Sequence, residues 1–119
     1  TVDGVDLHAM LAALNRRIEY LYDRDHTIGH AYFMGLNSLE ELEAVFRRKV
    51  IPLLQEYFYE DWRKIARVLN DRCDGTRFLK TEDLVPPDGF SEDDAGYQEI
   101  RKRYSVVDPF SPTAFQGLY

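Results

Sequence analysis

The residues best suited to chemistry gather in one stretch, Asp23 to Gly35, which is dense in charged, glycine, histidine and aromatic residues. Within it, Gly29 directly precedes His30 at an expected helix start. Exposed backbone N–H groups there, together with the imidazole, would suit contact with a phosphate or with the ring edge of a nucleotide. In the alternative interpretation, Ile28 and nearby aromatic rings pin the loop to the core and the charged residues pair locally. Residue spacing alone favours neither interpretation.

The rest of the sequence holds no recognisable catalytic motif. The seven glycines never form a phosphate-binding loop, and the sequence contains no nucleophile elbow and no Cys pair. His26 and His30 have the spacing that can place two imidazoles on one metal ion, with Asp25 beside them. Because Gly29 lies between the two histidines and no third ligand is implied, we predict no metal site. We likewise assign no catalytic residue.

Two basic clusters raise the question of nucleic-acid binding. One is the run Arg47 to Lys49, and the other consists of Arg63, Lys64 and Arg67. Solvated helix faces are the commoner explanation of such clusters. DNA binding through the second cluster is therefore the less favoured alternative, and we expect no direct DNA contact.

Helices are predicted on both sides of the histidine-containing loop. Apolar residues recur every three or four positions from Leu7 to Tyr22, which predicts an amphipathic helix capped by Asp3 or Asp6. The next helix should open at Ser38, because Glu41 follows at the capping-box spacing. The loop is thus expected between two well-formed helices.

Proline and glycine divide the rest of the chain. Pro52 predicts a break or kink at Val50–Ile51, after which an aromatic-rich helix should continue to near Asn70, before Gly75. A short hairpin formed by residues 77–79 and 100–107 fits the sequence beyond that point.

Ser111 and Pro112 signal a final short helix. The predicted fold is mainly α: a small helical bundle over residues 1–74, with an irregular C-terminal extension over residues 75–119 that packs back on it. The extension is where the short β-hairpin is expected.

The net charge of −6 comes from one segment. Residues 82–99 hold seven acidic residues and no Lys or Arg, which leaves 14 acidic and 15 basic residues elsewhere. Pro and Gly within the segment predict a solvated loop. The helical part is therefore expected to be nearly neutral.

Length and composition indicate one globular domain of 119 residues. The lone Cys73 cannot form an internal disulfide, which favours a reducing, cytoplasmic compartment. No apolar run approaches the ~20 residues that span a bilayer, so we expect no membrane association.

Four runs of this sequence resemble a known family: Leu14 to Ile18, Asp23 to His26, Ile28 to Phe33 and Ile51 to Trp62. Ile-Gly-His-x-Tyr-Phe followed at this separation by Pro-Leu-Leu-x-Glu-Tyr is a fairly specific pair of motifs. The sequence resembles the C-terminal helical lid of McrB-type AAA+ proteins, the nucleotide-hydrolysing motors of modification-dependent restriction systems. The resemblance covers about residues 6–70, together with the last residues of the chain.

The resemblance implies that the chain is one part of a longer motor protein. The lid in this family closes over a nucleotide, GTP or ATP with magnesium, that is held by an α/β AAA+ core, and it couples hydrolysis to neighbouring ring subunits. The implied partners are that core, those subunits and a McrC-like nuclease. Ile28, Gly29 and His30 are the implied nucleotide-binding residues, with Tyr32 as support for the loop. The chain alone is not expected to be catalytic.

One position departs from the family pattern. Some relatives carry Arg directly before Ile-Gly-His, where this sequence has Thr27. His30 would then act alone as the phosphate sensor, or Arg24 or His26 would reach in, or this lid would sense phosphate weakly. The sequence does not decide among them.

A different class of function is the alternative. A helical interaction module without a nucleotide role would dock partners through an exposed aromatic face on the helix after Pro52. That hypothesis predicts that some of Tyr57, Phe58, Tyr59 and Trp62 are exposed as a patch, and it loses its main feature if all four are buried.

Overall fold

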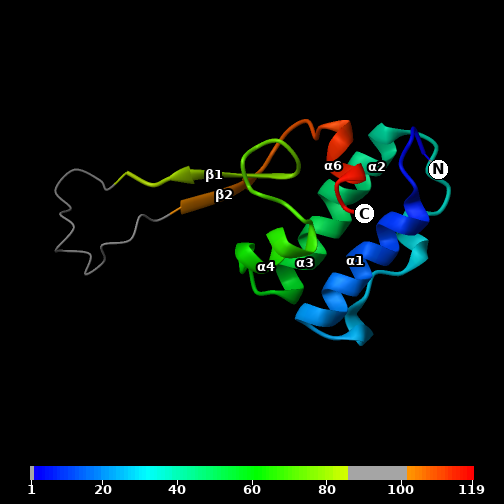
Figure 1. Cartoon of the computed structure of the whole chain (residues 1–119), viewed down its shortest axis with the longest axis horizontal. Coiled ribbons are helices and arrows are strands. Elements are labelled where there is room, and N and C mark those ends of the chain that lie inside the picture. Colours follow the sequence, from blue (N-terminus) through cyan, green and yellow to red (C-terminus); the bar gives the residue numbers. More distant parts are fainter. Residues whose placement is uncertain (1, 86–101) are drawn as a thin grey trace.

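The fold is a helical body from which a two-stranded hairpin extends, as Figure 1 shows. The structure is a computed structural model, and it describes residues 2–85 and 102–119. Both predictions of fold class are confirmed, because the domain is mainly α-helical and the hairpin forms in the C-terminal part. Most of the acidic segment, residues 86–99, lies outside the described residues.

Helix α1, Leu7–Leu21, is the predicted amphipathic helix. Its apolar stripe is buried, because Leu14 and Ile18 are fully enclosed by the core. Asp6 is the N-cap, and its carboxylate accepts a hydrogen bond from the Ala9 N–H at 3.1 Å. The Asp3 carboxylate instead accepts from the Leu39 N–H, at the start of the next helix.

The chain then forms two short 3₁₀ turns, η1 (Arg24–His26) and η2 (His30–Phe33). Helix α2, Leu39–Val45, follows with Ser38 as its N-cap. The Ser38 hydroxyl accepts from the Glu41 N–H as predicted. The Glu41 carboxylate, however, accepts from the Asn37 N–H and not from that of Ser38.

The predicted break before Pro52 is a change of helix type. A π-helical turn, η3 (Phe46–Val50), joins α2 to α3 (Ile51–Tyr57), and the backbone stays helical across the junction. The Ile51 N–H donates to the carbonyl of Phe46, five residues earlier. The wider turn leaves room for the proline ring, which in a regular α-helix would collide with the carbonyl four residues before it.

The single helix predicted from Pro52 to Asn70 is wrong. The structure divides it into α3 and α4 (Trp62–Val68), because Tyr59 and Glu60 adopt positive φ angles of 50° and 59°. Asp61 then caps α4 by accepting from the Arg63 N–H. A favourable N-cap at Asp61 therefore outweighs the helical spacing of the apolar residues.

The hairpin consists of β1 (Leu79–Asp83) and β2 (Lys102–Val106), which pair antiparallel. The first strand begins two residues later than predicted and includes Glu82 and Asp83, which the sequence placed in the acidic loop. Their partners in the register are Arg103 and Lys102, so opposite charges face each other across the ladder.

Helix α6, Pro112–Gln116, closes the C-terminal end of the core, with Ser111 as its predicted N-cap. Phe115 and Leu118 are buried. One cluster of buried residues includes apolar side chains from α1, α2, η3, α3, α4, β1 and α6. The division of the chain at residue 74 stays a prediction.

Arg47 and Glu43 tie the chain after β2 to the helices. The Arg47 guanidinium donates to the Glu43 carboxylate and to the Val107 carbonyl, and it lies 4.2 Å from the centre of the Phe110 ring. The Glu43 carboxylate also accepts from the Phe110 N–H. The prediction of a solvated basic run is therefore wrong for Arg47, whose side chain docks the C-terminal segment.

Candidate nucleotide-facing loop

The loop between α1 and α2 is anchored by Asn15 of α1. The Asn15 side-chain amide donates to the carbonyl of Ile28 at 2.8 Å, and its oxygen accepts from the Ile28 N–H at 2.6 Å. The Ile28 side chain is 3% exposed and belongs to the core. Ile28 therefore fixes the loop, since its side chain and both its backbone polar groups are engaged within the domain.

Gly29 and His30 follow this anchor and are exposed. A Cβ atom added at Gly29 would meet nothing within 4 Å, and its φ of −81° is an ordinary extended value. The His30 ring stacks against His8 of α1, with ring centroids 6.3 Å apart and planes 12° apart. These two histidines, with Leu7, Leu11, Phe33 and Met34, line a shallow hollow at this end of α1.

His26 lies in a separate aromatic cluster. Its ring stacks on Tyr22 with centroids 4.4 Å apart and meets the edge of Tyr57 at 5.1 Å. Asp23 Oδ1 lies 2.6 Å from His26 Nδ1 and also accepts from the His26 N–H. The side-chain hydrogen bond with His26 holds the pKa of Asp23 below its usual range.

The remaining loop residues have different surroundings. Arg24 is exposed, and its carbonyl accepts from the Thr27 hydroxyl at 3.1 Å. Tyr32 is half-buried and packs against the core, and its role as support for the loop stays a prediction. Burial raises the pKa of the Tyr57 phenol, and the nearby Tyr32 adds to the effect.

The structure brings Gly29 and His30 together on one exposed edge of the loop, whereas His26 turns to Tyr22 and Tyr57. The two histidines with metal-binding spacing thus have different neighbours. Among residues 2–85 and 102–119, no three His, Cys, Asp or Glu side chains are grouped to hold a metal ion.

Sequence reasoning missed Asn15, His8 and Tyr22. Asn15 could have been found from the sequence, because asparagine is a poor helix former and its presence inside an amphipathic helix indicates a tertiary hydrogen-bond partner. His8 and Tyr22 could not, since their partners depend on how the loop returns to α1.

The predicted aromatic docking face is dispersed in the structure. Phe58 is buried, Tyr57 and Trp62 are half-buried, and only Tyr59 of the four is fully exposed, at 88%. Trp62 stacks instead on Tyr104 of β2, with ring centroids 6.2 Å apart. One of the four rings is buried and one is exposed, so the alternative of an interaction module keeps Tyr59 as its exposed aromatic residue.

These features define a small helical domain in which an anchored loop with an exposed edge follows an amphipathic helix. The profile described as McrB, alpha-helical lid domain, matches residues 6–66, just over half of the chain. The chain belongs to this family of McrB-type helical lid domains. The matched residues run from the α1 cap into α4 and include the whole loop. No curated protein matches the chain.

None of the helices in the described part of the chain combines the length and apolar character that crossing a membrane requires.

Proposed function

We propose that this domain is the lid of a McrB-like AAA+ NTPase and closes over a nucleotide held by the protein's α/β core. The nucleotide would be GTP or ATP with magnesium, and Gly29 and His30 would face it. Family membership supports the role of the domain. The observation that carries the placement is the loop edge, anchored at Ile28 and exposed at the next two residues.

An anchored loop suits a moving lid. Because Asn15 ties the loop to α1, a rotation of the helical body would carry Gly29 and His30 with it as one unit. The rocking of the lid between nucleotide states would transmit hydrolysis to neighbouring ring subunits and to a McrC-like nuclease. The context is a cytoplasmic DNA restriction system in which other domains contact the DNA.

His30 is the phosphate-sensing group that we favour. Its ring is exposed beside the open approach at Gly29, whereas the Nδ1 atom of His26 is engaged by Asp23. Arg24 is exposed and is the second candidate.

The experiment compares steady-state nucleotide hydrolysis by the parent protein and its variants. His30→Ala should lower kcat/KM by about tenfold or more, the range for a lost hydrogen bond to a charged group. Gly29→Ala should raise KM while leaving the melting temperature unchanged, because the added methyl group meets only open space. Lys49→Ala, an exposed residue elsewhere, is the matched control.

Unchanged turnover and assembly in His30→Ala would exclude the role assigned to the loop edge. If kcat/KM falls only in Arg24→Ala or only in His26→Ala, the role of phosphate sensor belongs to that residue. Both variants are therefore measured in parallel.

A further inference from the structure

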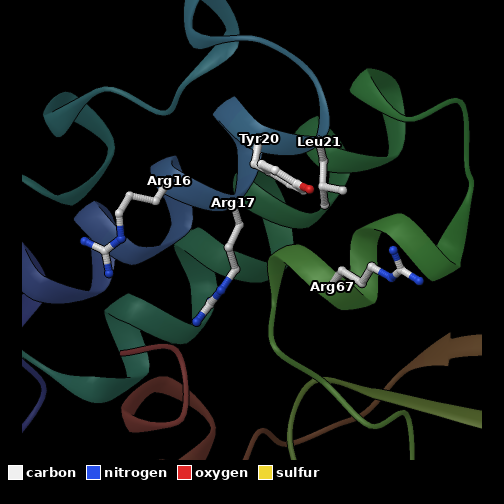
Figure 2. A pocket seen from close by; sticks show the side chains of 5 residues that line it. All are labelled: Arg16, Arg17, Tyr20, Leu21 and Arg67. Carbon is white, nitrogen blue, oxygen red and sulfur yellow. The ribbon is translucent and has the colours of Figure 1, made fainter.

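A groove with arginines on both sides lies between α1 and α4, away from the nucleotide-facing loop. Figure 2 shows Arg16, Arg17, Tyr20 and Leu21 of α1 on one side and Arg67 of α4 on the other. The hollow has a volume of about 270 Å³, and much of its lining is the apolar surface of these side chains. Tyr20 is 89% exposed, an unusual exposure for so large a ring.

The positive charge in this groove is not neutralised by the described part of the chain. Across residues 2–85 and 102–119, no carboxylate forms an ion pair with Arg16, Arg17 or Arg67. Arg17 is committed to the fold, because its guanidinium donates to the carbonyls of Val68 and Leu118. Burial, with Arg16 and Arg77 nearby, lowers the pKa of Arg17. Arg16 and Arg67 are exposed.

The chain itself contains a segment of complementary chemistry. Beyond the hairpin strand β1, residues 86–99 carry five carboxylates and no basic residue, and Phe90 and Tyr97 stand among them. Such a sequence matches a groove with guanidinium groups at its sides and apolar surface between them. A nucleic-acid strand matches it less well, because phosphate groups gain nothing from the apolar part of the lining.

The position of the hairpin favours a second copy as the source of this segment. β1 and β2 lead away from the helical body that holds the groove (Figure 1). We propose that the α1–α4 groove binds the acidic segment 86–99 of another copy of this chain. The two surfaces are different, so the contact is head-to-tail and propagates from copy to copy.

The test uses a fluorescein-labelled peptide of residues 86–99, titrated with the 119-residue chain at low and at physiological salt. Binding should be saturable and should weaken as salt rises. Arg16→Glu and Arg67→Glu should each weaken it by about threefold or more, and the double variant by about tenfold or more. Arg48→Glu makes the same charge change at an exposed position in η3 and should leave the affinity unchanged.

A charge swap makes the test specific. A peptide in which Glu92, Asp93 and Asp94 are replaced by Lys should lose binding to the wild-type chain and recover it with the Arg16→Glu/Arg67→Glu variant. The wild-type chain should also sediment faster with rising concentration, and the double variant should not.

Three results would overturn the proposal: no peptide binding at millimolar protein, equal weakening by Arg48→Glu, or concentration-independent sedimentation of the wild-type chain. Tighter binding of a single-stranded oligonucleotide than of the peptide, lost in the same arginine variants, would assign the groove to nucleic acid instead.

Discussion

Asn15, a residue of helix α1, holds the loop that carries the candidate site. Its amide forms both hydrogen bonds that hold the backbone of Ile28, and that residue lies directly before the exposed loop edge. A helix residue thus determines where Gly29 and His30 lie. The side chain acts on the site through the loop backbone, because it touches neither of those two residues in any described hydrogen bond.

Asn15→Ala should lower the free energy of unfolding by about 1–3 kcal/mol, because it leaves the part-buried backbone groups of Ile28 without partners. Urea denaturation measures the change. Asn37→Ala, at an exposed position, serves as the control and should stay within about 0.5 kcal/mol. Equal midpoints of urea denaturation for Asn15→Ala and the wild type would show that the loop does not depend on this anchor.

Asp23 offers a prediction about pH. The hydrogen bond with His26 favours the ionised carboxylate, so its pKa lies below the ordinary value of about 3.9. The contribution of this contact to stability is present above that ordinary value and is lost as the pH falls through the lowered pKa. In an NMR titration, the Asp23 midpoint should rise toward the ordinary value in His26→Ala. An unchanged midpoint in the variant would show that His26 is not the cause.

At the scale of elements, the turn between α3 and α4 directs Tyr59 outward and separates two helices that the apolar spacing would join. Tyr59 and Glu60 adopt left-handed conformations that side chains with a Cβ atom disfavour. The turn is held by hydrogen bonds from the Glu60 N–H to the Gln55 carbonyl and from the Asp61 N–H to the Phe58 carbonyl. Backbone strain is therefore accepted where two helices must pack at an angle that one helix cannot provide.

Glu60→Gly should leave stability unchanged or raise it by up to about 1 kcal/mol, because glycine adopts this φ without a penalty. Glu60→Val should lower it by about 1–2 kcal/mol. The matched pair at Glu56, inside α3, should behave differently, with Glu56→Gly costing up to about 1 kcal/mol. Thermal unfolding gives all four values, and a destabilising Glu60→Gly would contradict the strain assigned to this turn.

At the scale of the molecule, a cluster of phenylalanines joins the helices to the C-terminal segment. The Phe46 ring stacks on Phe78 at 5.2 Å and meets the edge of Phe115 at 5.0 Å, and Phe110 completes the group. Phe46, Phe78 and Phe115 are each at most 1% exposed. The core is thus built from residues on both sides of position 74.

Phe115→Ala should cost about 3–5 kcal/mol, the range for a buried phenylalanine, as measured by urea denaturation. Gln116→Ala, on the exposed side of α6, should change little.

A chain ending at residue 74 should lack a cooperative thermal transition, since Phe46 would lose its partners Phe78 and Phe115. A cooperative transition in that truncated chain would show that the helical part folds without the C-terminal segment.

The sequence by itself determined the features that depend on local periodicity and caps. The stripe of α1, the Ser38 and Ser111 caps and the approximate place of the hairpin were all readable, because a buried face and an N-cap leave their pattern within a few residues of the chain. The pair of motifs at Ile28 to Phe33 and Pro52 to Tyr57 also indicated the lid family.

Only the tertiary structure decided the contacts between distant residues. It divided the expected long helix at Tyr59 and Glu60, and it turned Arg47 from a solvated residue into a clamp on Val107. It also set Asn15 against Ile28 and brought Arg16 of α1 and Arg67 of α4 to one groove. The physical reason is that each of these features depends on a partner from another element. Such a contact leaves no periodic pattern in the sequence from which it could be predicted.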